Sequence, residues 1–315
     1  MASYALNMDK TNEEWARDIA TSVLHFNTWF MNFAPNTFIE QRKKAGNVVN
    51  DVFRITNNLV NLDAELIMPR RKEIIDVLRM ATRPPVAVDR LSGLAGVKND
   101  FVSGKITHVK GCDSNKLIDK LTKVLNAIFD FDLLPWLIKK EKPNYTDLLV
   151  AKTVICDRYS RAIADPIIRN EQECRQTNII QMFLEKKGYR HIESVKNMQD
   201  MEKGTFTFRH VVIGKDEAGN NVRIPVDVMI MRKDETKTLP LLIECKSAGD
   251  YTNTNKRRKE EAKHLDNLIN GYGEDVEFIL FLGGYFDKAF LDHVKGDGLD
   301  WIWEHRVEEL EIAGV

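Results

Sequence analysis

The sequence predicts an α/β fold in which a mixed central sheet is flanked by helices and preceded by a mainly helical region. Two observations predict it. Up to about residue 150 the chain repeats amphipathic helical patterns; after it the order becomes helix, three strands with short connections, helix and apolar strand. With 315 residues, the chain is long enough for one large domain or two ordinary ones. We therefore expect a helical region over residues 1–150 and a sheet-containing core over residues 151–315.

Composition is that of a soluble globular protein, with 43% hydrophobic and 30% charged residues. The net charge of −1 gives no global basic field, so contact with a polyanion must depend on local patches. The cysteines lack C-x-x-C spacing, which argues against a zinc site or disulfide scaffold and fits a reducing cytosol. They are Cys112, Cys156, Cys174 and Cys245. No signal peptide or membrane-spanning run is visible, so we expect a cytoplasmic protein.

The first region divides into four expected helices. Thr11 followed by Glu14 has the spacing of a capping box, which places a helix start there. The adjacent prolines at Pro84 and Pro85 end a later helix. The expected helices cover residues 11–33, 41–66, 72–83 and 115–138. Residues 139–147 form a charged, proline-containing connector, which we take as the internal boundary.

The second region begins with a helix whose expected N-cap is Asp165, with Pro166 at the first helical position. Gly188 closes this helix. The elements expected after it are strands at 205–214, 221–232 and 239–246, a helix at 255–273 and an apolar strand at 276–286. Short connections make the first three strands antiparallel, whereas the strand reached through the helix can pair in parallel.

Asp227, Glu244 and Lys246 are charged residues that lie inside these strands, where the pattern calls for burial. Strand side chains alternate between faces, so Glu244 and Lys246 share one face and Cys245 the other. In the preceding strand, Asp227 points away from the expected apolar face, which is formed by Ile224, Val226, Val228 and Ile230. Adjacent antiparallel strands can bring Asp227, Glu244 and Lys246 together on one surface of the sheet.

Such a group has a definite chemistry. Two neighbouring carboxylates repel each other unless a cation neutralises them, and oxygen ligands suit Mg²⁺, which also binds substrate phosphate. A lysine beside the metal can orient or deprotonate a water and stabilise charge on a phosphoryl transition state. We therefore predict Asp227 and Glu244 as metal ligands and Lys246 as the residue that positions and activates the attacking water.

The triplet Glu-x-Lys is weak by itself, and an exposed ion pair on an edge strand is the alternative. Three further triplets occur, two in predicted helices and one in a turn: Glu185/Lys187, Glu261/Lys263 and Glu235/Lys237. Only Glu244/Lys246 lies in an apolar strand joined to a strand that carries an Asp. On the preceding helix, Glu173 is a candidate auxiliary acid, although a solvated helix face explains it equally well.

A basic run follows Lys246 and opens the next helix. Cations at a helix N-terminus oppose its dipole, so contact with a phosphate backbone would explain them, and a solvated charged face is the alternative. The residues predicted to contact DNA are Asn253, Asn255, Lys256, Arg257, Arg258 and Lys259.

The Asp…Glu-x-Lys hairpin with its flanking helices resembles the PD-(D/E)XK nucleases. Pro225 stands one residue earlier than that motif expects, since Val226 directly precedes the Asp. Long stretches, among them "ADPIIRNEQECRQ", "PLLIECKSAGDYTNTNKRRKEEAKHL" and "FLGGYFDKAFLDHVKGDGLDWIWEHR", are similar to the XamI-type type II restriction endonucleases. The resemblance runs from about Leu78 to Arg306, and Cys245 departs from an expected Ala.

The resemblance implies an enzyme that uses Mg²⁺ to hydrolyse both strands of double-stranded DNA at a short palindrome, which for this family is GTCGAC. It also implies a homodimer and a companion DNA methyltransferase that protects the host's sites. The helical region then serves DNA binding, dimerisation or both. The alternatives are a structure-specific nuclease of DNA repair or recombination, and a non-catalytic DNA-binding protein on the same fold.

Overall fold

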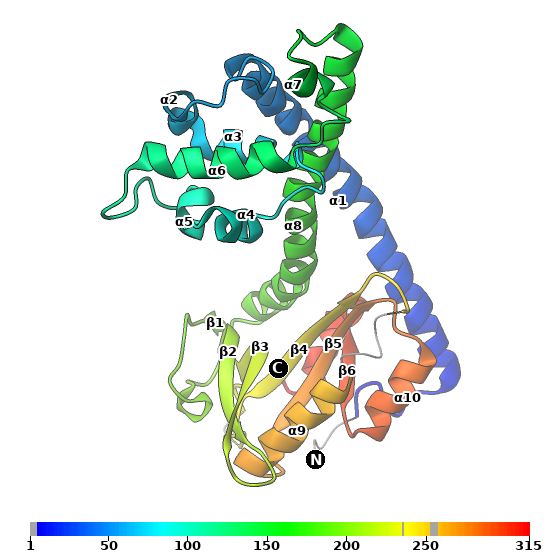
Figure 1. Ribbon diagram of the computed structural model, residues 1–315. Coiled ribbons are helices and arrows are strands. Elements are labelled where there is room, and N and C mark those ends of the chain that lie inside the picture. The colour runs from blue at the N-terminus through cyan, green and yellow to red at the C-terminus, as the bar shows by residue number, and fades with distance from the viewer. Residues whose placement is uncertain (1–4, 235, 253–257) are drawn as a thin grey trace. The chain divides into compact units, whose positions relative to one another are not determined.

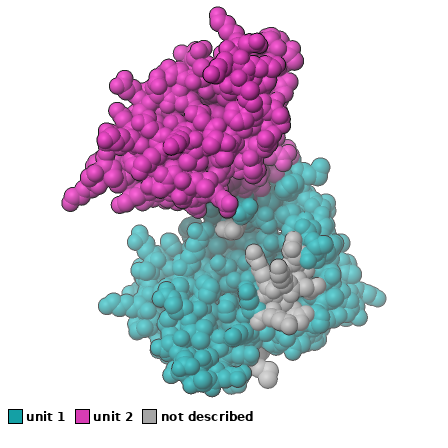
Figure 2. Space-filling model, viewed as in Figure 1, with its two compact units in different colours: residues 1–33, 169–315 teal, residues 34–168 magenta. Residues whose placement is uncertain are grey.

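The computed structural model describes residues 5–234, 236–252 and 258–315. It divides into two compact units (Figure 2). The sheet unit consists of Met1–Phe33 and Arg169–Val315, and the helical unit of Ala34–Ile168. Each unit has its own hydrophobic core, and we describe each by itself.

The helical unit is built from helices, as predicted, around buried side chains such as Phe53, Ile74, Leu78 and Leu121. Its elements include the C-terminal part of α1 and the N-terminal part of α8. The bounds are α1 Asn12–Ile55, α2 Ala64–Ile67, η1 Met68–Arg70, α3 Arg71–Met80, α4 Val88–Ala95, α5 Asn99–Val102, α6 Ser114–Ile128, α7 Pro135–Lys139 and α8 Tyr145–Lys186. Over the described parts of the chain, no helix combines the length and apolar character needed to cross a membrane.

The units are not divided at residue 150, because two long helices each contribute to both. α1 continues through Pro35, and α8 continues through Pro166, where we had expected a helix to begin. A proline inside a helix removes one hydrogen bond and costs about 3 kcal/mol, which a long helix packed on both sides can offset. The two divisions, after residues 33 and 168, lie beside these prolines.

The N-terminal segment belongs to the sheet unit for a visible reason. The backbone N–H groups of Leu6 and Asn7 donate to the Asp300 carboxylate at 2.7 and 2.9 Å. Trp15 packs edge-on against Trp301, with 5.4 Å between ring centroids. These contacts join residues almost 300 positions apart, so nothing local in the sequence indicates them. Trp301 is fully buried.

The sheet unit contains a mixed sheet in the order β1-β2-β3-β4-β5-β6 (Figure 1). The strands are β1 Arg190–His191, β2 Thr205–Lys215, β3 Asn221–Met231, β4 Leu241–Ala248, β5 Glu277–Gly284 and β6 Asp300–Trp303. The β2–β3 and β3–β4 pairs are antiparallel, while β1–β2, β4–β5 and β5–β6 are parallel. The predicted meander and the parallel β5 are therefore confirmed. The remaining helical elements are α9 Arg258–Tyr272, α10 Lys288–Gly296, η2 Met198–Asp200 and η4 Glu304–Glu311.

Helices cover both faces of this sheet. Ile180 and Leu184 of α8 pack with Ile243 and Phe281 on one face, which we call the α8 face. On the other, the α9 face, Leu268 of α9 packs with Leu242. α9 lies across this face in Figure 1.

One expectation about the strand faces is wrong. Val228 and Ile230 lie on the α8 face, but Ile224 and Val226 pack on the α9 face, so the four do not share a side. On the neighbouring strand, Arg209 has φ +53°, in the left-handed region. In the register, Arg209 and Asp227 lie opposite each other, between the pairs Phe208↔Val228 and His210↔Val226, and the ladder of paired residues is interrupted there. The reversal on β3 falls at the position opposite Arg209, and a strict period of two does not predict it.

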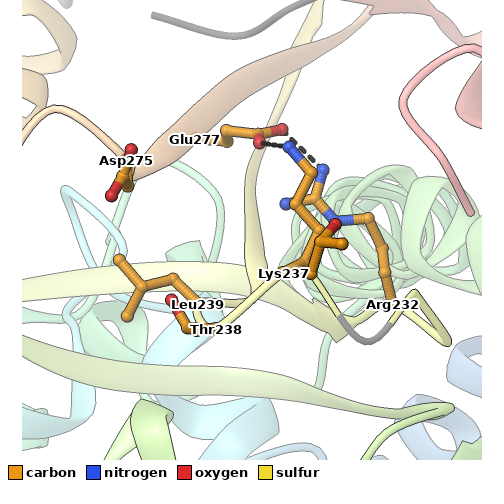
Figure 3. A pocket seen from close by; sticks show the side chains of 7 residues that line it. Arg232, Lys237, Thr238, Leu239, Asp275 and Glu277 are labelled. Carbon is orange, nitrogen blue, oxygen red and sulfur yellow. Dashed lines mark hydrogen bonds and ion pairs between the residues drawn. The ribbon is translucent and has the colours of Figure 1, made fainter.

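A pocket of about 290 Å³ lies where β3 ends and β4 begins, lined by Arg232, Thr236, Lys237, Thr238, Leu239, Asp275 and Glu277 (Figure 3). Inside it, the Glu277 carboxylate accepts from Arg232 Nη1 at 2.6 Å and from Lys237 Nζ at 2.7 Å. Arg232 is only 1% exposed, so its charge needs this partner. The pocket is a structural feature at the opposite end of β4 from Lys246.

Candidate active site

The candidate site lies where β3 and β4 separate. Pairing between these strands runs from Ile230↔Leu241 to Val228↔Ile243 and is not continued at the next position, which holds Asp227 on β3 and Glu244 on β4. Instead, the Asp227 carboxylate accepts a hydrogen bond of 2.8 Å from the Cys245 backbone N–H. The strands therefore part at the two acids, and this leaves room for carboxyl groups within an otherwise apolar sheet.

Glu244 and Lys246 are brought together as the alternation of β4 predicts. Ile243 and Cys245 belong to the α8 face. Glu244 and Lys246 point to the α9 face, where Lys246 Nζ contacts Glu244 Oε1 at 3.0 Å and Glu261 Oε1 of α9 at 2.7 Å. The three side chains are 14%, 17% and 5% exposed for Glu244, Lys246 and Glu261.

Burial sets the protonation of the group. It raises the pKa of Glu244 from 4.5 to about 7; Lys246 lowers this pKa, while the Asp227 and Glu261 charges raise it. Burial also lowers the pKa of Lys246, but its two carboxylate neighbours outweigh this and leave the pKa above its ordinary value. Burial raises the pKa of the Cys245 thiol well above its usual value, and the nearby carboxylates act in the same direction. A raised pKa disfavours the thiolate, the form of cysteine that acts as a nucleophile.

Glutamines of α8 hold the end of β4 from the opposite face. Gln176 Nε2 donates to the carbonyl oxygens of Lys246 at 3.2 Å and of Phe281 at 3.0 Å, which ties β4 to β5. Gln172 Nε2 donates to Ser247 Oγ at 3.2 Å. The backbone that carries Lys246 is thus fixed on both sides, as a site with a defined geometry requires.

Comparisons with known proteins identify the family of this chain. The sequence model of the XamI restriction endonuclease family matches residues 57–303. The chain is 39% identical to the type II restriction enzyme SalI of Streptomyces albus G, over 98% of this chain and 99% of that enzyme. The chain belongs to the XamI restriction endonuclease family. The predicted family is confirmed, and with it a type II site-specific endonuclease that acts on DNA.

Among solved structures, this family member is similar to protein VC1899 from Vibrio cholerae, with 12% identity and a TM-score of 0.27. The match covers 84% of this chain but only 55% of that one, so the chain spans about half of its length. The mixed α/β architecture is instead established by the sheet itself, whose order and helical layers are consistent with a restriction endonuclease fold.

Several predicted site residues of the family member lie outside the part of the chain that the structure describes. Asn253, Asn255, Lys256 and Arg257 fall there completely. Arg258 and Lys259 lie in the first turn of α9, and Glu173 lies within α8. The structure describes the backbone of these three residues but not their side chains. Their roles stay predictions.

Glu261 is the site residue that the sequence argument missed. We set its Glu-x-Lys triplet aside because it lies in a helix, yet its side chain is nearly fully buried against Lys246. A signal was available in the helical period. Glu261 stands four residues before Leu265 and seven before Leu268, which places it on the apolar side of α9. A charged residue in such a stripe indicates a buried partner.

The Asp227 and Glu244 carboxylates fit a magnesium ion. Within the described ranges, no group of three His, Cys, Asp or Glu side chains could hold a metal. Mg²⁺, however, usually keeps several waters and binds through one or two carboxylates together with substrate phosphate. Asp227 and Glu244 supply such a pair. Burial raises the pKa of Glu244, the Asp227 charge acts in the same direction, and a bound cation would favour the ionised carboxylate.

Proposed function

We propose that this enzyme hydrolyses both strands of double-stranded DNA at GTCGAC, with Mg²⁺ as cofactor, through a PD-(D/E)XK site formed by Asp227, Glu244 and Lys246. The observation that supports the proposal is the pair of acids where β3 and β4 part, beside a lysine held at 3.0 Å from one of them. The GTCGAC specificity is proposed from the family to which the chain belongs.

Each residue has a distinct task in this proposal. Asp227 and Glu244 hold the cation, which when bound polarises the scissile phosphate and lowers the pKa of a water. Asp227 also accepts from the Cys245 N–H, which fixes its carboxylate relative to β4. Lys246 orients the attacking water and offsets the negative charge that grows on the phosphoryl oxygens. Glu173 is retained as a candidate auxiliary acid.

The palindrome also bears on assembly. A twofold-symmetric DNA site is matched by a twofold-symmetric protein, so we propose a homodimer in which each protomer cuts one strand. The helical unit is proposed to contribute DNA contacts, the dimer interface or both. A DNA methyltransferase that modifies the same sequence is the expected functional partner, since it would protect the host's own sites.

Digestion of a mapped plasmid that carries a single GTCGAC tests the function. With Mg²⁺ we expect one linear product, and run-off sequencing of its ends should place both breaks within the site. A plasmid with one base pair of the site changed is the matched control and should stay intact. Nicks at junctions or flaps instead of discrete ends would favour the repair nuclease, and no Mg²⁺-stimulated cleavage of any DNA would favour the non-catalytic alternative.

The basic run gives a separate prediction about DNA binding. Replacing Lys256, Arg257, Arg258 and Lys259 with Gln should weaken binding and flatten its dependence on salt. Each phosphate contact contributes about 0.9 to the slope of log K against log salt, so loss of all four should reduce the slope by up to about 3.6. The measurement is a titration of fluorescent duplex at several salt concentrations. An unchanged slope would favour the alternative that these residues form a solvated helix face without DNA contacts.

A further inference from the structure

The proposed hydrolysis leaves one buried acid of the site without a task. Glu261, the fourth residue of α9, has a side chain that is 5% exposed and lies 2.7 Å from Lys246 Nζ. An ion pair this well buried contributes little net stability, because desolvation of both charges offsets their attraction. Its presence beside the proposed reacting group therefore suggests a role in the reaction.

The two carboxylates around Lys246 come from different elements. Glu244 is on β4, two residues before the lysine, and contacts its ammonium group at 3.0 Å. Glu261 reaches the same group from α9. A lysine side chain has four flexible carbons and many rotamers, so a single neighbour on its own strand restricts it only in part. A second anion on a separate helix limits the ammonium to the region between the two.

α9 is held firmly enough to serve as this second anchor. Leu268, two turns after Glu261, is fully buried on the α9 face. The helix also approaches β2 at two glycines. A Cβ added to Gly214 would lie 2.7 Å from the Asn267 carbonyl oxygen, and one added to Gly271 would lie 3.2 Å from Gly214 Cα. This close contact fixes α9 on the sheet, and with it the position of the Glu261 carboxylate.

We propose that Glu261 is a positioning residue, which holds the Lys246 ammonium group where it can act on the water and phosphate. This inference rests on the proposed role of Lys246. Glu244 is a metal ligand in that proposal, so its carboxylate would have to contact both the cation and the Lys246 ammonium group. Glu261 provides a hold on Lys246 that does not depend on Glu244.

The test compares Glu261→Ala, Glu261→Gln and Glu261→Asp in cleavage of a GTCGAC duplex. Displacement of a reacting group by about 1 Å can cost on the order of 10²-fold in rate, so we expect a loss of kcat of about that size for Glu261→Ala with KM within about twofold. Glu261→Gln keeps an acceptor of the same length and should recover about tenfold of this loss. Glu261→Asp keeps the charge but is too short, and should resemble Glu261→Ala.

Three controls give each outcome a meaning. Glu260→Gln changes an exposed acid in the same helical turn and should behave as wild type. Thermal unfolding of each variant reports folding, and the isosteric Glu261→Gln keeps the test valid where Glu261→Ala is destabilised. Adding Glu261→Gln to Lys246→Ala should bring no further loss of rate, because the glutamate acts through the lysine.

Several results would overturn the inference. One is a wild-type kcat for both Glu261→Gln and Glu261→Asp in folded protein. Another is a rise in KM at constant kcat, which would indicate DNA binding. A tenfold or greater rise in the Mg²⁺ concentration needed for half-maximal rate would make Glu261 a metal ligand instead. Normal cleavage by Lys246→Ala would count against the proposed function itself, so the two failures are distinguishable.

Discussion

Replacing Asp227 or Glu244 with alanine is expected to abolish cleavage of GTCGAC. The two acids occupy the position where pairing of β3 with β4 ends, and they are the proposed ligands of Mg²⁺. A bound cation provides several kcal/mol of transition-state stabilisation, so loss of one ligand should lower the rate on the order of 10³-fold or more. The measurement is the single-turnover rate on a duplex with one site.

Isosteric variants separate charge from shape in this test. Asp227→Asn can still accept from the Cys245 N–H, and Glu244→Gln fills the same space, so both should fold normally and yet fail to cut. Glu217→Ala, in the exposed turn between β2 and β3, is the matched control for a lost surface acid and should cut at the wild-type rate. Full plasmid cleavage by Asp227→Asn or Glu244→Gln would show that the replaced acid is not a ligand of the catalytic metal.

The sequence correctly predicts the positions of Glu244 and Lys246 because they depend on short-range rules. Glu244 and Lys246 lie in an apolar strand of period two, and the short connection between residues 232 and 239 makes the strand before it antiparallel. Those rules correctly place both side chains on the α9 face and Cys245 on the α8 face. The capping box at Thr11 is confirmed for the same reason, since Glu14 Oε2 accepts from the Thr11 N–H at 2.8 Å.

The sequence argument is wrong where a distant or rare event decides the structure. The face to which β3 side chains point changes between Val226 and Val228, opposite the positive φ of Arg209, and no turn residue indicates this change in the sequence. Proline is compatible with the first turn of a helix and, when the helix is well packed, with its interior. Pro166 lies in the interior of α8. The helical period places Glu261 on the apolar side of α9, but its partner Lys246 becomes evident only when α9 packs on the sheet, with the close approach at Gly214.

Removing the charge of Lys246 should stop the chemistry yet leave specific DNA binding largely in place. Its ammonium group contacts the carboxylates of Glu244 and Glu261, and the side chain is 17% exposed. It can therefore support the transition state but has little surface to offer the duplex. For Lys246→Ala we expect a fall in the single-turnover rate of at least about 10²-fold, the usual contribution of one such donor. The Kd for a GTCGAC duplex, measured at fixed salt with Ca²⁺ in place of Mg²⁺, should change by less than about threefold, since no phosphate contact is lost.

A second effect of Lys246→Ala follows from the acids it leaves behind. Lys246 lowers the pKa of Glu244, so its removal should raise that pKa above about 7, while Glu261 loses its cation. Protons then compete with Mg²⁺ for Glu244, and more Mg²⁺ should be needed at pH 6.5 than at pH 8. If Lys246→Ala instead lost DNA binding together with cleavage, Lys246 would have a structural role in the site and not a role in the reaction.

Lys246→Arg distinguishes the charge of this residue from its geometry. Arginine restores a cation between Glu244 and Glu261, so protein stability and the Mg²⁺ requirement should return toward wild type. Its guanidinium is a wide, planar fork, whereas the ammonium is a compact group that sits 3.0 and 2.7 Å from the two carboxylates. The fork cannot occupy that point without moving one of them, so cleavage should remain slow. Recovery of the rate in Lys246→Arg would show that charge alone suffices, and would contradict both the positioning of the ammonium and the role inferred for Glu261.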